Sequence, residues 1–262
     1  MNGTAIASPH GTLWVRESGQ PGPPLVCLHG FSLHGQMFAT LAQQHELPFR
    51  ILAPDLPGHG RTTVSPADLP TTVESLGMWL DRLKGRFPVL GYSQGGRIAL
   101  HLARRRPDLV SRLVLVSAGT GLAEPQRTTR RMADEALAGR IESEGIARFL
   151  DAWLSHPLTG TGRLTASAAA ADRRLRAENA ASGLAAALRG LGQGAMDQID
   201  PAELKIPTLW VAGALDERYA ADAQVSARRA AGRAVVIDGA GHNIVAERPG
   251  EIAGIATEFL SS

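Results

Sequence analysis

The chain is poor in several residue types, and each scarcity narrows what the protein can be. Its 262 residues include one cysteine, Cys27, so no internal disulfide can form. Cys27 lies in the apolar run 25–28, which predicts a small buried side chain rather than a reactive thiol. Only Lys84 and Lys205 are lysine, so nearly every cation is an arginine, the better bidentate clamp for a carboxylate.

Long apolar runs and blocks of one charge are also missing. No segment approaches membrane-spanning length, and the N-terminus shows no charged stretch followed by an apolar one, the mark of a secretory signal. The 27 basic and 25 acidic residues are interspersed, which gives no reason to expect a nucleic-acid partner. We expect a cytoplasmic protein without a membrane or nucleic-acid partner. The oligomeric state stays open.

The histidines do not indicate a metal site. His10, His34, His45 and His156 are scattered without the spacing that metal ligands need. We expect neither a metal nor another cofactor.

Short apolar runs bounded by Gly, Pro and Asp predict strands buried on both faces. These runs are Thr12–Arg16, Pro24–His29, Arg50–Pro54, Pro88–Gly91, Val110–Ser117, Pro207–Gly213 and Ala234–Asp238. Helical segments are expected between them, at Gly35–Gln44, Thr71–Lys84, Gln94–Arg105, Ala220–Ala230 and Pro249–Leu260. This alternation predicts an α/β fold with a doubly wound, mostly parallel sheet.

One stretch breaks the alternation. Residues 121–197 contain no convincing strand, and helices are expected at Gln126–Arg140, Ile146–Leu154, Ala166–Asn179 and Gly183–Leu191. An insert of this kind usually covers the mouth of a site. We therefore expect a core of residues 1–120 and 198–262 and a helical cap of residues 121–197. The alternative is an extra structural layer that does not contact a ligand.

The strongest chemical signal is Gly91-Tyr92-Ser93-Gln94-Gly95, a G-x-S-x-G pattern. A predicted strand leads into it and a predicted helix leaves it, so the serine hydroxyl should stand at a tight turn above the sheet. A serine needs a proton acceptor to act at neutral pH. His242, in a glycine-rich loop after the last strand, is the best candidate, and Asp216, after the strand 207–213, would orient its imidazole.

His29-Gly30-Phe31 ends the second core strand and is similar to the H-G motif that places an oxyanion hole. The backbone N–H groups of Phe31 and Gln94 are the expected donors. Such donors stabilise the negative charge that develops on a carbonyl oxygen during reaction. His29 itself is expected to support the loop rather than to react.

Four motifs together resemble the α/β-hydrolase superfamily over residues 24–260: HGF, DLPGHG, GYSQGGRIAL and GAGHN. More narrowly, the chain is similar to the 2-succinyl-6-hydroxy-2,4-cyclohexadiene-1-carboxylate (SHCHC) synthases of menaquinone biosynthesis. The features that carry this resemblance are Gly96-Arg97-Ile98-Ala99, Arg127-Thr128-Thr129-Arg130, Phe149-Leu150-Asp151-Ala152-Trp153, Pro157-Leu158, Leu175-Arg176 and Leu184-Ala185-Ala186.

The resemblance implies a lyase rather than a hydrolase. In that family the triad serine removes a substrate proton and pyruvate is eliminated. The substrate carries several carboxylates, and the matching motifs imply that Arg97, Arg130 and Arg176 bind them. Tyr92 and Trp153 would line the pocket.

Other interpretations of the same residues remain open. Each of the three arginines could instead belong to a solvated helix face, since acidic residues lie near Arg130 and Arg176. The same triad could hydrolyse a carboxylic ester through an acyl-serine intermediate. A ligand-binding protein without catalysis is a third possibility, although such a protein needs no activated serine.

Overall fold

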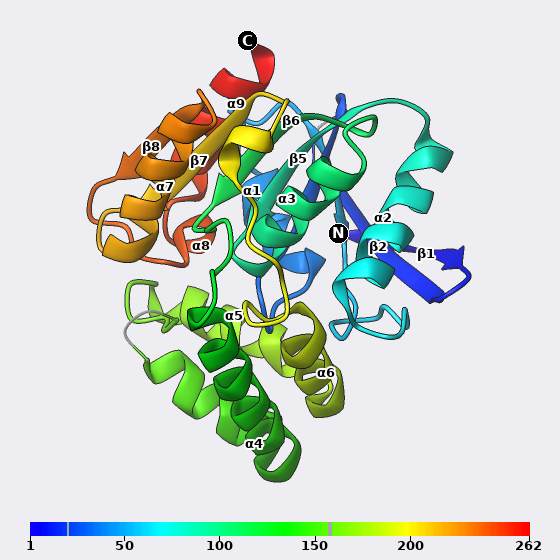
Figure 1. Ribbon diagram of the computed structural model, residues 1–262, viewed down its shortest axis with the longest axis vertical. Coiled ribbons are helices and arrows are strands. Elements are labelled where there is room, and N and C mark those ends of the chain that lie inside the picture. Colours follow the sequence, from blue (N-terminus) through cyan, green and yellow to red (C-terminus); the bar gives the residue numbers. More distant parts are fainter. Residues whose placement is uncertain (20, 157–158) are drawn as a thin grey trace.

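The computed structural model describes residues 1–19, 21–156 and 159–262, which form an eight-stranded sheet flanked by helices (Figure 1). The strand order is β1-β2-β4-β3-β5-β6-β7-β8. β1 and β2 pair antiparallel, as do β2 and β4, and all other neighbours are parallel. The predicted mostly parallel sheet is confirmed. The strands are β1 (Asn2–Ser8), β2 (Gly11–Gly19), β3 (Pro24–Leu28), β4 (Arg50–Pro54), β5 (Phe87–Tyr92), β6 (Val110–Val116), β7 (Thr208–Gly213) and β8 (Arg233–Ile237).

Helices cover both faces of this sheet. Alternate residues of β3 face opposite ways: Val26 and Leu28 pack in the cluster that includes α2, α3 and α7, whereas Leu25 and Cys27 pack in the cluster that includes α1, α8 and α9. Burial on both faces explains why the strands appear as continuous apolar runs. These helices are α1 (Ala39–Ala42), α2 (Leu69–Leu83), α3 (Gln94–Arg105), α7 (Glu217–Arg229), α8 (Ile244–Glu247) and α9 (Pro249–Ser261).

The chain between β6 and β7 forms a helical insert, which lies as a separate layer at one end of the sheet (Figure 1). It contains α4 (Gln126–Ser155), α5 (Ala166–Ala177) and α6 (Ala181–Leu191), and its described residues contain no strand. Gly145, with φ 83° and ψ 168°, interrupts α4 close to the predicted break between two helices. The insert starts and ends at one place, where the backbone N–H of Ile199 donates to the carbonyl oxygen of Thr120 at 2.9 Å.

Several predicted boundaries are wrong. β1 was not predicted, because most of its side chains are exposed and it shows no apolar face. The expected helix 35–44 is a 3-10 turn, Gly35–Phe38, followed by the single turn of α1. α7 begins at Glu217 rather than Ala220, with Asp216 at its N-cap position. A second 3-10 turn, Pro201–Glu203, and the short α8 were also missed.

No helix in residues 1–19, 21–156 and 159–262 is both long enough and apolar enough to span a bilayer. Cys27 is buried, and burial raises the pKa of its thiol, in keeping with the predicted unreactive side chain. The quoted residues Pro157 and Leu158 lie outside the described part of the chain.

Candidate active site

Ser93 stands at a sharp turn between β5 and α3. Its φ of 52° and ψ of −110° are unusual for a residue with a side chain, and such strain is typical of functional sites. The flanking glycines permit the turn. A Cβ at Gly91 would lie 2.6 Å from the Cα of Gly96, and one at Gly95 would lie 2.2 Å from the carbonyl oxygen of Leu28. The G-x-S-x-G pattern therefore reflects backbone contacts on both sides of the serine.

The imidazole of His242 lies between Ser93 and Asp216. Its Nε2 is 3.0 Å from Ser93 Oγ, and its Nδ1 is 2.6 Å from Asp216 Oδ2. Asp216 is 3% exposed and His242 is 8% exposed. The backbone N–H of Leu215 donates to the carbonyl oxygen of Ala240 at 3.0 Å, which joins the loops that carry the acid and the histidine. This geometry allows the imidazole to accept the serine proton while the carboxylate stabilises the resulting cation.

Two backbone N–H groups border the serine. Gln94 is the first residue of α3, where an N–H has no acceptor within the helix. Phe31 follows β3, and no described residue accepts a backbone hydrogen bond from its N–H. Both residues line the same cavity as Ser93. Both N–H groups lack a backbone acceptor in the part of the chain that the structure describes, and they stay the candidates for the predicted oxyanion hole.

Two buried histidines support the loop that carries Phe31. Nε2 of His29 accepts a hydrogen bond from the N–H of Leu56 at 2.8 Å, and Nε2 of His59 accepts one from the N–H of Ser32 at 3.2 Å. Burial lowers the pKa of both side chains, that of His59 to about 4. Both rings are therefore neutral near pH 7, which these acceptor roles require.

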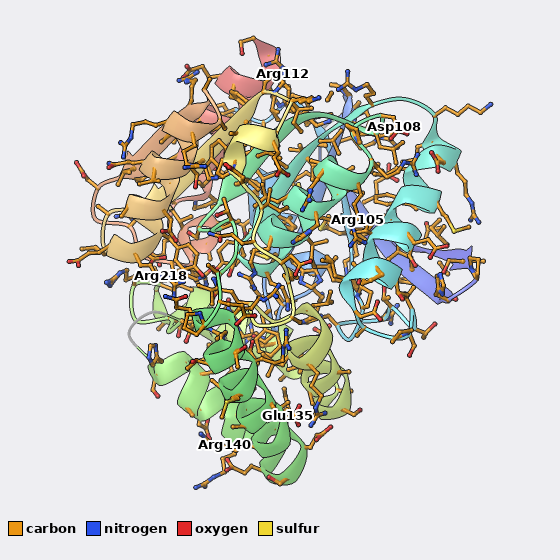
Figure 2. All side chains as sticks on the ribbon, viewed as in Figure 1. Arg105, Asp108, Arg112, Glu135, Arg140 and Arg218 are labelled. Atoms are coloured by element: carbon orange, nitrogen blue, oxygen red, sulfur yellow. The ribbon has the colours of Figure 1, made fainter. Side chains whose placement is uncertain are left out.

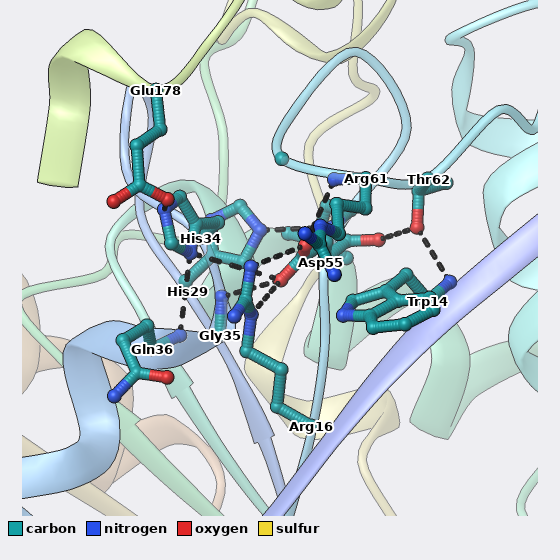
Figure 3. Close-up of polar contacts among 12 residues, drawn as sticks. Trp14, Arg16, His29, His34, Gly35, Gln36, Asp55, Arg61, Thr62 and Glu178 are labelled. Carbon is teal, nitrogen blue, oxygen red and sulfur yellow. Dashed lines mark hydrogen bonds and ion pairs between the residues drawn. The ribbon is translucent and has the colours of Figure 1, made fainter. Parts of the chain in front are cut away.

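The carboxylate of Asp55, fully buried after β4, holds the same loop (Figure 3). It accepts hydrogen bonds from Arg16 Nε at 2.9 Å, from the backbone N–H of Gly35 at 2.9 Å and from that of Arg61 at 2.9 Å. His34 lies near it, with Nδ1 3.9 Å from Oδ1. The carboxylate thus connects β2 to the loops that follow β3 and β4.

Arg97, in the first turns of α3, lines a cavity of about 110 Å³ together with Ser93 and His242. The side chain is 8% exposed, its Nε has no hydrogen-bond partner, and it forms no ion pair with any described residue. Burial lowers the pKa of Arg97, but a guanidinium stays charged in proteins. A buried cation without a counterion is unfavourable, so an anion in this cavity would be stabilised.

The other two arginines of the sequence analysis reach the same region but have partners. Arg130 of α4 lines the cavity beside Arg97, and its Nε is 2.7 Å from Asp134 Oδ1. Arg176 of α5 lines a small adjoining cavity of about 30 Å³ that also borders Ser93. Its guanidinium pairs with Asp172 at 2.5 Å and donates to the Ser32 hydroxyl at 2.5 Å. Arg176 therefore also anchors the loop that carries Phe31.

Aromatic rings complete the walls. Tyr92 is 4% exposed and lies with its ring centroid 5.7 Å from that of His242. Trp153 of α4 packs edge-to-face on Phe31 at 5.5 Å. Trp153 and Phe31 line both cavities beside Ser93. The insert therefore supplies part of the wall around the serine.

Within residues 1–19, 21–156 and 159–262, no three His, Cys, Asp or Glu side chains gather as metal ligands would. The charged groups that meet at the cavities are instead arginines. They suit carboxylates or other anions rather than cations.

Comparison with known proteins identifies the family. The family model for the alpha/beta hydrolase fold matches residues 23–249. The chain belongs to the α/β-hydrolase family. This α/β-hydrolase is 32% identical over 250 residues to the SHCHC synthase of Salmonella agona (strain SL483), covering 92% of its own chain and 96% of the relative. It is 33% identical over 249 residues to a Bacillus subtilis (strain 168) protein named for the same synthase, covering 91% and 90%.

Solved structures agree on the fold. MenH from S. aureus superposes with a TM-score of 0.88 at 28% identity, over 94% of this chain and 97% of the other. A thermophilic esterase from Thermogutta terrifontis superposes with a TM-score of 0.83 at 23% identity, over 100% and 98%. The second likeness concerns the fold alone. The resemblance read from the sequence motifs is confirmed at the level of the family.

The sequence analysis missed several residues of this α/β-hydrolase that line or support the site. Tyr219 and Gln193 line the cavity beside Arg97 and are 7% and 3% exposed. Asn179 links the end of α5 to the loop that carries Phe31, and Asp172 pairs with Arg176, which binds the same loop. Only Tyr219 left a signal, since it follows Asp216 by three residues. The other contacts depend on how the insert packs on the core.

Proposed function

We propose that this α/β-hydrolase is an SHCHC synthase, a carbon–oxygen lyase of menaquinone biosynthesis that eliminates pyruvate from a polycarboxylate cyclohexene substrate. The supporting observation is Arg97, a buried cation without a counterion in the cavity that borders Ser93. A neutral ester has no need of such a charge, whereas a carboxylate does. The names of the relatives that match most of the chain point to the same activity.

In this proposal Ser93, His242 and Asp216 act as a proton-transfer unit. Ser93 Oγ takes a proton from a ring carbon of the substrate as its own proton passes to His242 Nε2. Asp216 stabilises the imidazolium through Nδ1. The electron pair of the broken C–H bond forms a new C=C bond, and a C–O bond breaks to release pyruvate as its enolate. The enolate then takes up the proton held by the imidazolium of His242, which leaves the substrate proton on Ser93 and restores the triad.

The remaining groups bind and stabilise charge. The N–H groups of Phe31 and Gln94 would stabilise the oxygen on which negative charge develops after proton removal. Arg97, Arg130 and Arg176 would bind the substrate carboxylates, with Arg130 and Arg176 exchanging their present acidic partners for the substrate. Tyr92 and Trp153 would shape the walls and reduce water access.

The helical insert is the proposed cap of this site. Arg130, Trp153, Leu188 and Gln193 belong to it and line the same cavity as Ser93, which belongs to the core. The proposed division into a core (1–120 and 198–262) and a cap (121–197) rests on this shared lining. We further propose that the enzyme works in the cytoplasm on a small-molecule substrate.

The test is release of pyruvate from the menaquinone precursor by the purified enzyme. Ser93→Ala should lower kcat by about 10²–10⁴-fold, the range of general acid–base catalysis. Arg97→Met should lower kcat/KM by about 100-fold or more, because two charge-assisted hydrogen bonds are lost. Arg112→Met is the matched control, since Arg112 lies at the opposite end of the molecule from the insert (Figure 2). No pyruvate release by the unmodified enzyme would reject the lyase.

A second candidate function, hydrolysis of a carboxylic ester through an acyl-serine, is favoured by a cavity of about 290 Å³ inside the insert. Its apolar lining includes Leu137, Ile141 and Phe149, and it shares Arg130 and Trp153 with the cavity at Ser93. An apolar ester group would fit there. Rapid turnover of neutral p-nitrophenyl esters that Arg130→Ala leaves unchanged would support this hydrolase over the lyase.

A further inference from the structure

Tyr219 is the third residue of α7 and follows Asp216 closely in the chain. It is 7% exposed and lines the cavity that also borders Ser93, Arg97 and His242. The side chain therefore shares this cavity with the histidine of the triad and with the buried cation.

The ring of Tyr219 packs against the imidazole. Its centroid is 5.0 Å from that of His242, and the planes are inclined by 49°. Tyr92 contacts the same imidazole, with a centroid distance of 5.7 Å. The Tyr219 ring also contacts Arg218, whose Cζ lies 5.6 Å from the ring centroid. Arg218 lies where α7 faces the insert (Figure 2). These contacts fix the ring and restrict the motion of the histidine.

The hydroxyl of Tyr219 has no hydrogen-bond partner in the described part of the chain. The hydroxyl is not fully buried, so a molecule bound in the cavity could supply an acceptor. Arg97 shares the cavity and also lacks a partner at Nε. The two groups lie close enough that a negative charge on the Tyr219 oxygen would raise the pKa of Arg97. An O–H donor and a guanidinium without an ion-pair partner among the described residues thus line one cavity.

We propose that Tyr219 is a substrate-binding residue whose hydroxyl donates a hydrogen bond to the carboxylate held by Arg97, while its ring positions His242. The proposal deepens the proposed function and rests on the cavity at Ser93 being the substrate site. The cavity would thus recognise an anion through a guanidinium and a phenol hydroxyl together, which is more selective than recognition by a single cation.

The test measures binding of succinate, a simple dicarboxylate, to the full chain by isothermal titration calorimetry. Tyr219→Phe keeps the ring and should raise the dissociation constant about tenfold, as expected for the loss of a hydrogen bond to a charged group. Arg97→Met should abolish measurable binding. Ser226→Ala is the control, because it removes a hydroxyl from the same helix but away from the cavity at Ser93, and should leave the constant unchanged.

The role of the ring has its own measurement, the rate at which a neutral fluorophosphonate modifies Ser93. The Ser93 oxygen attacks phosphorus and fluoride leaves, so the rate reports on the serine–histidine pair without an anionic substrate. Tyr219→Leu should slow this reaction about tenfold, whereas Tyr219→Phe should not. A rate in Tyr219→Leu equal to that of the unmodified enzyme would reject the positioning role.

The succinate measurement tests whether the Tyr219 hydroxyl contributes to anion binding. Equal dissociation constants in Tyr219→Phe and the unmodified protein, or no succinate binding by the unmodified protein, would overturn the proposal. Weaker binding by Tyr219→Phe in a protein that never releases pyruvate would instead reject the lyase and leave the anion site in place.

Discussion

At the scale of single residues, the site depends on how closely two backbone segments approach at Ser93. Gly95, in the first turn of α3, lies directly over the end of β3, where any Cβ would meet the carbonyl oxygens of Leu28 and His29. Neither oxygen can move without shifting the strand. Gly254, in the middle of α9, has no atom within 4 Å of the position that a Cβ would take. The two helical glycines therefore have opposite packing environments.

Gly95→Ala should lower the free energy of unfolding by about 3 kcal/mol, at the upper end of overpacking costs, and abolish reaction at Ser93. Gly254→Ala, its control, should raise the free energy of unfolding by about 0.5–1 kcal/mol, because alanine is the better helix former. Urea denaturation followed by circular dichroism measures both. Similar changes in the two variants would contradict the assigned role of the close contact.

Single residues also show what the sequence could predict. Ser93, Asp216 and His242 each follow a strand at the same end of a parallel sheet, so their proximity follows from chain order and local pattern. The pairing of the arginines could not be predicted in the same way. Arg176 meets Ser32, which is 144 positions away, and the nearby acid Asp134 of α4 pairs with Arg130 rather than with Arg97.

At the scale of elements, the end of α5 holds the insert on the core. The side chain of Asn179, just beyond α5, is 4% exposed. Its Nδ2 donates to the carbonyl oxygen of Ser32 at 2.8 Å, and its Oδ1 accepts from the N–H of Gly60 at 2.8 Å. One amide therefore joins the insert to the loops after β3 and β4, the first of which carries Phe31.

Asn179→Ala should lower the free energy of unfolding by about 2–4 kcal/mol, because two buried backbone groups lose their partners. Hydrogen exchange of the amides in residues 30–35 should become faster. Arg174→Ala is the control: Arg174 of α5 is exposed and forms no hydrogen bond or ion pair with the described residues, so its removal should cost at most about 0.5 kcal/mol and leave this exchange unchanged. Unchanged exchange in Asn179→Ala would show that the loop is held by other contacts.

Elements also differ in how well the sequence predicted them. Strands buried on both faces, such as β4 (Arg50–Pro54), appear as apolar runs and were predicted with their bounds. β1 was missed because it is stabilised by its pairing with β2 along an exposed edge, which leaves no apolar pattern. The start of α7 was missed because Asp216 was assigned only to the site, whereas it also stands at the N-cap position of this helix.

At the scale of the whole molecule, buried neutral histidines couple stability to pH. His59 and His101 are 2% and 4% exposed, and burial lowers the pKa of each to about 4. Arg104 and Arg105 lower the pKa of His101 further, whereas a hydrogen bond and the charge at Asp197 act in the opposite direction. Unfolding exposes these side chains and returns their pKa to about 6.5.

Unfolding therefore takes up protons between pH 6.5 and about 4, so the free energy of unfolding should fall as the pH drops through this window and level off below it. Between pH 6.5 and 5 the loss should be about 2 kcal/mol for each histidine. Urea denaturation at several pH values measures it. His101→Gln should reduce the slope by about one proton relative to the unmodified protein. Equal slopes would show that His101 is not responsible.

The hydrogen bond between Ile199 and Thr120 brings the two ends of the helical insert to one point beside β6 and β7. A loop whose ends already touch can change length or sequence at little cost to the scaffold that carries it. We expect that evolution, or an engineer, could exchange the helices of the insert and keep the sheet, the serine turn and the histidine loop in register, provided that the contacts of Arg176 and Asn179 with the core loops are retained. Substrate selectivity would then change with the insert, while Ser93, Asp216 and His242 stayed on the sheet and its loops.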